Sequence, residues 1–141
     1  MRYLGLDLGN RTVGIAISDG LGIVETGIET YRFKEKDLQN AFNYVKMIIV
    51  DRNVDKVVLG LPKNMDGTLG FQAEYVMEFK GMLNDAGIEV ELFDERLTTM
   101  EVTKIMIGAD LSRNKRKKEV DKLAAVVILQ SYLDNINRKG K

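Results

Sequence analysis

The chain has 141 residues, enough for one domain with a hydrophobic core, and we expect residues 1–141 to fold as a single domain. It contains no cysteine and no histidine, which excludes disulfides, thiolate nucleophiles, Cys/His zinc sites and imidazole bases. Lys and Arg together number 21, as do Asp and Glu, so the net charge is zero. Any chemistry must therefore use carboxylates, hydroxyls, Lys or Arg, with an oxygen-ligated ion such as Mg²⁺ or Mn²⁺ as the candidate cofactor.

The charge is unevenly distributed along the chain. Residues 96–141 carry 11 basic and 5 acidic side chains, whereas residues 1–95 carry 10 basic and 16 acidic ones, which gives net charges of +6 and −6. This separation favours a basic face. No apolar run approaches the roughly 20 residues of a membrane span, and no signal peptide opens the chain, so we expect a cytoplasmic protein.

Three short strands are predicted at the start of the chain. They cover Tyr3–Gly9, Val13–Ser18 and Ile23–Tyr31, and turn signals at residues 9–11 and 19–20 join them. Because such short connections place neighbouring strands side by side in opposite directions, we expect an antiparallel meander.

Helices and strands alternate in the rest of the chain. Apolar spacing and a capping box predict the order helix, strand, helix, strand, helix, helix, at Asp37–Val50, Asp55–Gly60, Phe71–Leu83, Ile88–Phe93, Thr98–Ile107 and Val120–Ile136. The two later strands are expected to be parallel, since each follows a helical crossover. The sequence therefore predicts an α/β fold, a mixed sheet of three antiparallel strands and then two parallel strands, flanked by helices.

Asp7 interrupts an otherwise apolar strand. Period-two alternation places it on one face with Gly5 and Gly9, which leave room above it, while the leucines at positions 4, 6 and 8 occupy the other face. A carboxylate at this position must be solvated, paired or bound to a cation, because burying it alone is costly. The alternative is an acid that bonds only to backbone amides near Gly9.

Asp121 is the second acid in an unusual position. It lies at the centre of the apolar stripe of the last expected helix, which contains Ala124, Ala125, Ile128 and Tyr132. Alanines allow a helix to approach a sheet closely, which would bring Asp121 over the edge of the sheet. The alternative is an acid that only complements the dipole of the first helical turn.

A third acid is available at the end of the last strand, where Asp94 and Glu95 follow one another. Consecutive strand residues face opposite sides, so at most one of them shares the face of Asp7. Acids from the first strand, the last strand and the final helix could meet at one point, where like charges need a positive partner. In a chain without histidine, we expect that partner to be two Mg²⁺ or Mn²⁺ ions about 4 Å apart, which would activate water against a phosphodiester.

Four segments, taken in order, resemble the YqgF/RuvX family of RuvC-like nucleases in the ribonuclease H superfamily. They are Leu4–Asp19, Val58–Gly67, the Asp-Glu-Arg-Leu-Thr-Thr string at residues 94–99, and Val120–Leu129. The family is associated with processing of pre-16S rRNA and, earlier, with resolution of Holliday junctions. One departure is Asn10-Arg11, where the family pattern has a small or hydroxyl residue and then Lys, so a cation is retained. The resemblance implies a ribonuclease H-like sheet.

The resemblance also implies a set of site residues. Asp7, Glu95 and Asp121 would be the catalytic acids and would hold the divalent ions, with Asp94 as the competitor of Glu95. The residues similar to the family's nucleic-acid contacts are Arg11, Lys63, Asn64 and Arg96. For the two arginines the alternative is an ordinary surface ion pair, and for the loop around Lys63 it is a plain Asp-Gly turn.

A basic segment precedes the last expected helix. Five of its six positions are cations, namely Arg113, Lys115, Arg116, Lys117 and Lys118. As a phosphate-binding segment it would make nucleic-acid binding strongly salt-dependent, and the alternative is a solvated loop. The sequence has no ladder of aromatic residues for stacking bases, so we expect recognition of backbone and shape.

We therefore expect a nuclease that hydrolyses phosphodiester bonds of pre-16S rRNA in 5′-end processing during ribosome biogenesis. The alternatives are a Holliday junction resolvase that acts on four-way DNA junctions, and a non-catalytic nucleic-acid-binding module. An ATPase or sugar kinase of the actin-like type would need two such cores, and 141 residues supply one. The sequence leaves open RNA against DNA, endonuclease against exonuclease, and monomer against homodimer.

Overall fold

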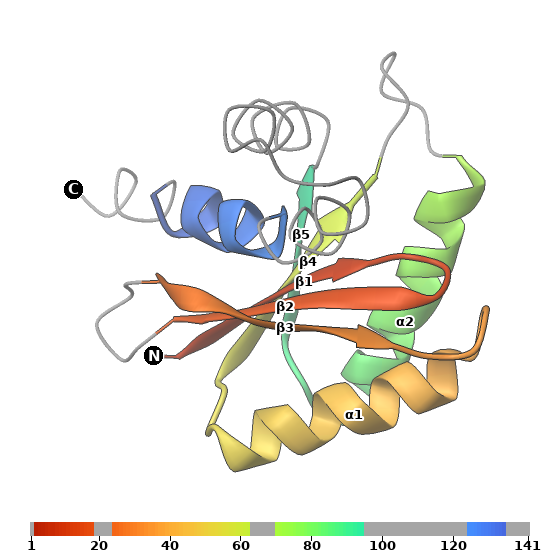
Figure 1. Cartoon of the computed structure of the whole chain (residues 1–141), viewed down its shortest axis with the longest axis horizontal. Coiled ribbons are helices and arrows are strands. Elements are labelled where there is room, and N and C mark those ends of the chain that lie inside the picture. The colour runs from red at the N-terminus through yellow and green to blue at the C-terminus, as the bar shows by residue number, and fades with distance from the viewer. Residues whose placement is uncertain (1, 19–23, 63–69, 95–123, 135–141) are drawn as a thin grey trace, which may run out of the picture.

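The computed structural model describes residues 2–18, 24–62, 70–94 and 124–134. In this part of the chain, five strands form one sheet in the order β3-β2-β1-β4-β5 (Figure 1). The strands are β1 (Tyr3–Leu8), β2 (Thr12–Ser18), β3 (Val24–Arg32), β4 (Lys56–Leu61) and β5 (Val90–Asp94). β2 is antiparallel to both β1 and β3, whereas β4 is parallel to both β1 and β5. The predicted mixed α/β sheet is confirmed.

Two helices cover one face of this sheet. α1 (Leu38–Asp51) begins where the Asp37 carboxylate accepts a hydrogen bond from the amide of Asn40, at 3.2 Å. α2 (Phe71–Asp85) ends shortly before Gly87, whose φ of +80° is the left-handed conformation that glycine adopts without strain.

The opposite face of the sheet carries a further helix. Residues 124–134 are helical and lie across the sheet from α1 and α2 (Figure 1). We call this segment the C-terminal helix. Among the described residues, no helix combines the length and the apolar character that crossing a bilayer requires.

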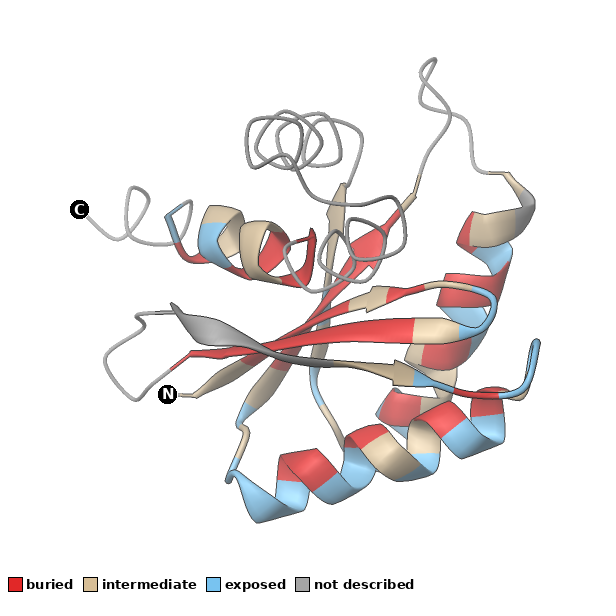
Figure 2. Cartoon of the chain, in the orientation of Figure 1, coloured by how far each residue is buried: buried red, intermediate tan, exposed pale blue. Residues whose placement is uncertain are grey.

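The alternation of β1 divides the core into two clusters (Figure 2). Leu4, Leu6 and Leu8 pack on the side of α1 and α2, in the larger cluster. The smaller cluster lies on the other face, where Ala16 and Val58 of the sheet meet the buried side of the C-terminal helix, namely Ala125, Ile128, Leu129 and Leu133. The predicted assignment of the leucines to one face of β1 is thus confirmed.

The observed elements differ from the expected ones mainly at their ends. β4 and β5 begin one and two residues later than expected, and α2 runs two residues further, to Asp85. The buried side of α2 includes Ala73, Val76 and Leu83, whereas Met82 is only partly buried. The expected helix at residues 98–107 and the basic loop at 113–118 lie outside the described residues.

Candidate active site

Asp7 lies near the carboxyl end of β1 and is half-buried. It pairs with Gly14 of β2 across the antiparallel side of the strand. Because β1, β4 and β5 are parallel, their carboxyl ends, Leu8, Leu61 and Asp94, share one edge of the sheet. This edge is where polar side chains of an open α/β sheet usually form a site.

Glycines surround Asp7 on its own face of the sheet. Gly5 in β1 and Gly9 just after this strand flank Asp7 in the sequence, and Gly14 is its partner on β2. On β4, Gly60 directly follows Leu59, the partner of Leu6. The sheet around the carboxylate therefore carries no side chains that would fill the space above it. Sequence reasoning identified Gly5 and Gly9 but missed Gly14 and Gly60. Their signal was available, since a glycine inside a run of β-branched residues often marks a close approach of another group.

The C-terminal helix comes very close to the sheet beside this carboxylate. A Cβ atom on Gly5 would lie 2.8 Å from the Cβ of Leu129 and 2.9 Å from the carbonyl oxygen of Ala125. Only a glycine permits this distance, so the backbone of the helix rests almost directly on β1. The predicted close approach through an alanine is confirmed at Ala125, which is fully buried.

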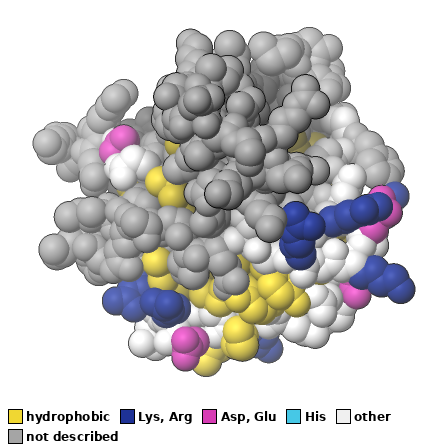
Figure 3. Space-filling model, viewed as in Figure 1, with side chains coloured by type: hydrophobic (Ala, Val, Ile, Leu, Met, Phe, Trp, Pro, Cys, Tyr) yellow, Lys and Arg dark blue, Asp and Glu magenta, His cyan; other side chains and the backbone are white. Residues whose placement is uncertain are grey.

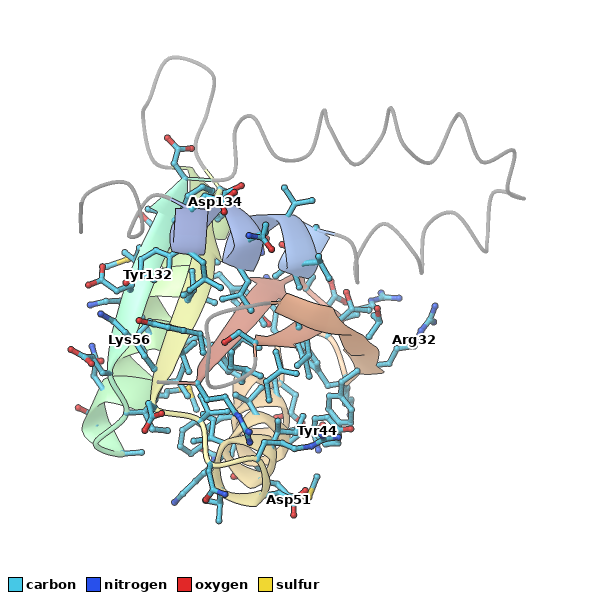
Figure 4. The ribbon with its side chains drawn as sticks, turned by 90° about the vertical axis from the view of Figure 1, so that its left-hand side faces the viewer. Arg32, Tyr44, Asp51, Lys56, Tyr132 and Asp134 are labelled. Carbon is cyan, nitrogen blue, oxygen red and sulfur yellow. The ribbon has the colours of Figure 1, made fainter. Side chains whose placement is uncertain are left out.

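Tyr132 anchors the other end of the C-terminal helix to the sheet. Its ring packs edge-on against Tyr3, with the ring centres 5.8 Å apart, and the Lys56 ammonium lies 5.9 Å from its centre. Lys56 also forms an ion pair with Glu91 of β5 at 3.3 Å, and Lys56 and Tyr132 lie side by side in Figure 4. Burial raises the pKa of the Tyr132 hydroxyl. Burial lowers the pKa of Lys56, but its hydrogen bonds and charge interactions with Tyr132 and Glu91 outweigh this effect, and the net pKa is raised.

The packing at the end of β5 shows on which face of the sheet Asp94 lies. Phe93 packs in the cluster of the C-terminal helix, whereas Leu92 packs on the side of α1 and α2. Asp94, the next residue, pairs with Leu61, which is also buried on the side of α1 and α2. Since pairs of strand neighbours share a face, Asp94 faces away from the side of the sheet on which Asp7 lies.

Arg11 stands in the turn between β1 and β2. Its guanidinium forms an ion pair with Glu35 at 3.2 Å, and the two side chains are 71% and 52% exposed. The turn itself is supported by the segment before α1, because the amides of Phe33 and Lys36 donate to the carbonyls of Arg11 and Asn10. In the space-filling view, Lys and Arg side chains gather on the right-hand side, where Figure 1 shows this turn and the start of α1 (Figure 3).

Several expected site residues lie outside the described residues. They are Glu95 and Asp121, and the expected nucleic-acid contacts Lys63, Asn64, Arg96, Arg113, Lys115, Arg116, Lys117 and Lys118. Of the expected site, the structure thus describes Asp7 and Arg11, together with the competitor Asp94. Within the described ranges, no three acidic side chains come together as a group that could hold a metal ion.

Comparison with known proteins identifies relatives along the whole chain. The model of the RuvX family, described as Holliday junction resolvase, matches residues 1–135. A Clostridium botulinum protein named "Putative pre-16S rRNA nuclease" is 52% identical over 141 residues, covering 98% of this chain and 100% of its own. A Bacillus subtilis protein of the same name is 49% identical over 138 residues, covering 97% of this chain and 100% of its own.

Solved structures share the fold at low sequence identity. RuvC of T. thermophilus, solved in complex with a Holliday junction substrate, has a TM-score of 0.63 and 14% identity, and the match covers 100% of this chain and 97% of that one. The Fowlpox virus resolvase, solved with Holliday junction DNA, has a TM-score of 0.58 and 17% identity, with 96% and 99% covered. These structures show that the fold is shared, and the family model and the two relatives show that the chain belongs to the RuvX family of nucleases.

Proposed function

We propose that this chain hydrolyses phosphodiester bonds of pre-16S rRNA, using Asp7, Glu95 and Asp121 to hold divalent cations, Mg²⁺ or Mn²⁺. The observation that carries the proposal is the position of Asp7. A half-buried carboxylate lies among glycines near the carboxyl end of the central strand, so no side chain of its immediate sheet neighbours stands between it and an ion or a phosphate. A structural acid would instead be expected to have side-chain or backbone partners filling that space.

The C-terminal helix supports Asp121 as the second acid. Asp121 precedes Ala125 by four residues, the spacing at which helical side chains share a face. Ala125 packs over Gly5, and Gly5 lies two residues before Asp7 on the same face of β1. The contact that brings the helix backbone onto the strand thus involves a residue four positions after Asp121 in the sequence and a residue two positions before Asp7.

The end of β5 supports Glu95 over Asp94 as the third acid. Asp94 shares the face of Leu61, away from Asp7. Phe93 packs on the face of Asp7, and if the alternation of β5 continued for one more residue, Glu95 would share that face. The competitor is therefore disfavoured by the packing of its neighbours.

Oxygen ligands of this kind suit Mg²⁺ and Mn²⁺. When bound, such ions supply Lewis-acid stabilisation of the charge that develops on the phosphate and make water a better nucleophile. The chain's own part is to fix the carboxylates on rigid elements. Gln72 contributes to this, because its side-chain amide donates to the Leu8 carbonyl at 3.1 Å and ties the first turn of α2 to the end of β1. Arg11, in the adjacent turn, is positioned to contact the nucleic-acid backbone.

The choice of pre-16S rRNA follows the relatives that are about half identical over their full length. A four-way DNA junction is the second candidate, favoured by the fold shared with RuvC in complex with its junction substrate. The two differ in polymer, so one experiment separates them.

The test is cleavage by the purified chain of two end-labelled substrates, a 16S rRNA precursor that keeps its 5′ leader and a four-way DNA junction. Each is incubated with Mg²⁺, with Mn²⁺ or with a chelator. We expect cleavage of the RNA with either ion and none with the chelator. Cleavage of the junction alone would favour the second candidate, and a folded chain that cuts neither would contradict the nuclease proposal.

A further inference from the structure

Arg32 is the last residue of β3, and it is exposed. Tyr31, which precedes it in the strand, packs against the larger cluster on the side of α1 and α2, and Phe33, which follows it, is buried in the same cluster. Because successive side chains of a strand point to opposite faces, Arg32 belongs to the other face, which carries Asp7 and the C-terminal helix. In Figure 4 its side chain extends outward from the end of β3 on that side of the sheet.

The pairing of β1, β2 and β3 assigns Arg32 to the same face. Asp7 pairs with Gly14, and Gly14 pairs in turn with Thr30, two residues before Arg32. Residues paired directly across two strands share a face, and so do residues two positions apart in one strand. Gly14 adds no side chain between Asp7 and β3, so this part of the face is low next to the carboxylate.

The separation of Arg32 from Asp7 follows from the strand geometry. Arg32 pairs with Thr12, which is two residues from Gly14, and β3 is two strands away from β1. With about 3.4 Å per residue along a strand and about 4.8 Å between strands, the two backbones are roughly 12 Å apart. A few nucleotides of a nucleic-acid strand cover this span. A strand that runs from Asp7 toward β3 would thus bring a second phosphate to the Arg32 side chain.

The Arg32 guanidinium is available for such a phosphate. Among the described residues, no ion pair or side-chain hydrogen bond involves it, whereas Arg11 pairs with Glu35 at 3.2 Å. The two arginines belong to the same end of the sheet, because the amide of Phe33 donates to the Arg11 carbonyl at 2.8 Å. A guanidinium binds phosphate through two parallel N–H groups, which makes arginine well suited to this contact.

We propose that Arg32 binds a backbone phosphate of the nucleic acid whose scissile bond lies at Asp7, and that Arg11 and Arg32 together direct the strand across β2 to the outer edge of the sheet at β3. The proposal rests on the nuclease function proposed above. Contacts of this kind fix the position of a nucleic acid without reading its sequence. The competing role for Arg32 is that of a charge that keeps the outer strand β3 from pairing with other chains.

The experiment measures the affinity of the full chain for the precursor RNA and for the four-way DNA junction over a range of salt concentrations. Ca²⁺ replaces Mg²⁺, and the labelled strands are checked for intactness. Arg32→Gln should weaken binding of the better-bound nucleic acid by about five- to ten-fold at low salt, and the slope of log affinity against log salt should be less steep by about one unit. Since Arg32 is exposed, its replacement should leave the melting temperature unchanged.

Arg52→Gln is the matched control, because it removes the same charge from another exposed position. Arg52 follows α1, and its carbonyl accepts a hydrogen bond from Arg2, so it lies beside the start of β1, at the opposite end of this strand from Asp7. The control should match the parent in both affinity and salt slope.

A second measurement locates the contact on the nucleic acid. A series of strands each carries one methylphosphonate linkage, which removes the charge of a single phosphate. The linkage that faces Arg32 should weaken binding to the parent and have no further effect on Arg32→Gln, because both changes remove the same contact. In cleavage with Mg²⁺, Arg32→Gln should raise KM and leave kcat close to that of the parent, since the contact is the same before and during the reaction.

The outcomes separate this proposal from the proposed function. If Arg32→Gln has the affinity and the salt slope of the parent, the proposal is overturned and Arg32 is a charge of an outer strand. Binding that depends on Arg32 without any cleavage by the parent would support the contact and contradict the nuclease function. A folded chain that binds neither nucleic acid would contradict both.

Discussion

At the scale of single residues, the Arg11 side chain has one partner among the described residues and a second one in the proposed complex with nucleic acid. In the structure it pairs with Glu35, but both side chains are largely solvated, and such pairs contribute only about 0–1 kcal/mol to stability. The ion pair is therefore weak enough to be exchanged for a phosphate. The sequence could indicate a cation next to Asp7 but not this pair, because its two members are 24 residues apart.

Arg11→Gln should thus leave the free energy of unfolding nearly unchanged and weaken binding of RNA. If Arg11 contacts a phosphate, the slope of log affinity against log salt becomes less steep by about one unit. Glu35→Gln is the matched control, since it breaks the same ion pair and keeps the cation, and its RNA affinity should not fall. If both variants weaken RNA binding equally, the ion pair between Arg11 and Glu35 supports RNA binding and Arg11 does not contact a phosphate.

Replacement of Gly5 should disturb the site without removing a polar side chain. Gly5→Ala places a Cβ against Leu129 and the Ala125 backbone, and we expect a loss of about 1–3 kcal/mol of unfolding free energy together with reduced activity. Gly81→Ala on α2 is the comparison, because nothing lies within 4 Å of the added atom. It should stabilise the chain by about 0.5–1 kcal/mol, since glycine is unfavourable inside a helix. Urea denaturation of both variants checks this, and a neutral Gly5→Ala would contradict the close approach.

At the scale of elements, the contacts of the C-terminal helix with the sheet include the close approach at Gly5 and the packing of Tyr132 against Tyr3 and Lys56. The pKa values of Tyr132 and Lys56 are both raised in the folded chain, above ordinary values of 10.0 and 10.5. The folded chain therefore holds these protons more tightly than the unfolded chain. The contribution of these two protonated groups to the free energy of unfolding is fully present below about pH 10. It is lost as the pH rises through the pKa values of the folded chain.

We accordingly expect the urea midpoint to fall between pH 9 and pH 11, and to fall less steeply in Tyr132→Phe. Burial also raises the pKa of Tyr75, so some pH dependence should persist in this variant. Identical pH profiles for the parent and Tyr132→Phe would show that Tyr132 does not couple helix docking to protonation.

At the scale of the whole molecule, one face of the sheet supports the larger core and the other carries the candidate site. The face of Leu4, Leu6 and Leu8 supports the larger core under α1 and α2, while the glycine-rich face carries Asp7 and the C-terminal helix. Substitutions in the larger core should therefore lower the free energy of unfolding more than they lower the cleavage rate. Substitutions around Asp7 on the second face should have the opposite balance of effects.

The assignment of Asp7 and the leucines of β1 to opposite faces could be predicted from the sequence. Side chains of a strand alternate with a period of two, and Asp7 is the charged residue in an otherwise apolar strand. The sequence was also sufficient for the mixed sheet, since short turns and helical crossovers determine strand direction. The buried side of α2 was less predictable, because Val76 and Leu83 fill space against strands whose distance depends on the tertiary packing. The cavity between residues 36–39 and α2 could not be predicted, since its lining comes from two segments that lie far apart in the sequence.

The separation of charge along the chain belongs to the whole molecule as well. Replacing the five cations of residues 113–118 by Gln should weaken RNA binding and flatten its salt dependence by roughly 0.7–0.9 per lost phosphate contact. Lys46→Gln, at an exposed position of α1, should change neither. If the slope of log affinity against log salt is unchanged after all five cations are replaced, this segment is a solvated loop that does not contact RNA.

The most direct test of the central claim is the cleavage rate of Asp7→Asn with Mg²⁺ or Mn²⁺, measured on whichever nucleic acid the parent cuts. Asp51→Asn, at the exposed end of α1, is the matched control. We expect Asp7→Asn to fold like the parent and to lose activity by roughly two orders of magnitude or more, while Asp51→Asn keeps its rate. The reason is that Asp7→Asn removes a carboxylate proposed to hold the cations that stabilise the charge of the transition state. A folded Asp7→Asn chain that cuts as fast as the parent would contradict the account.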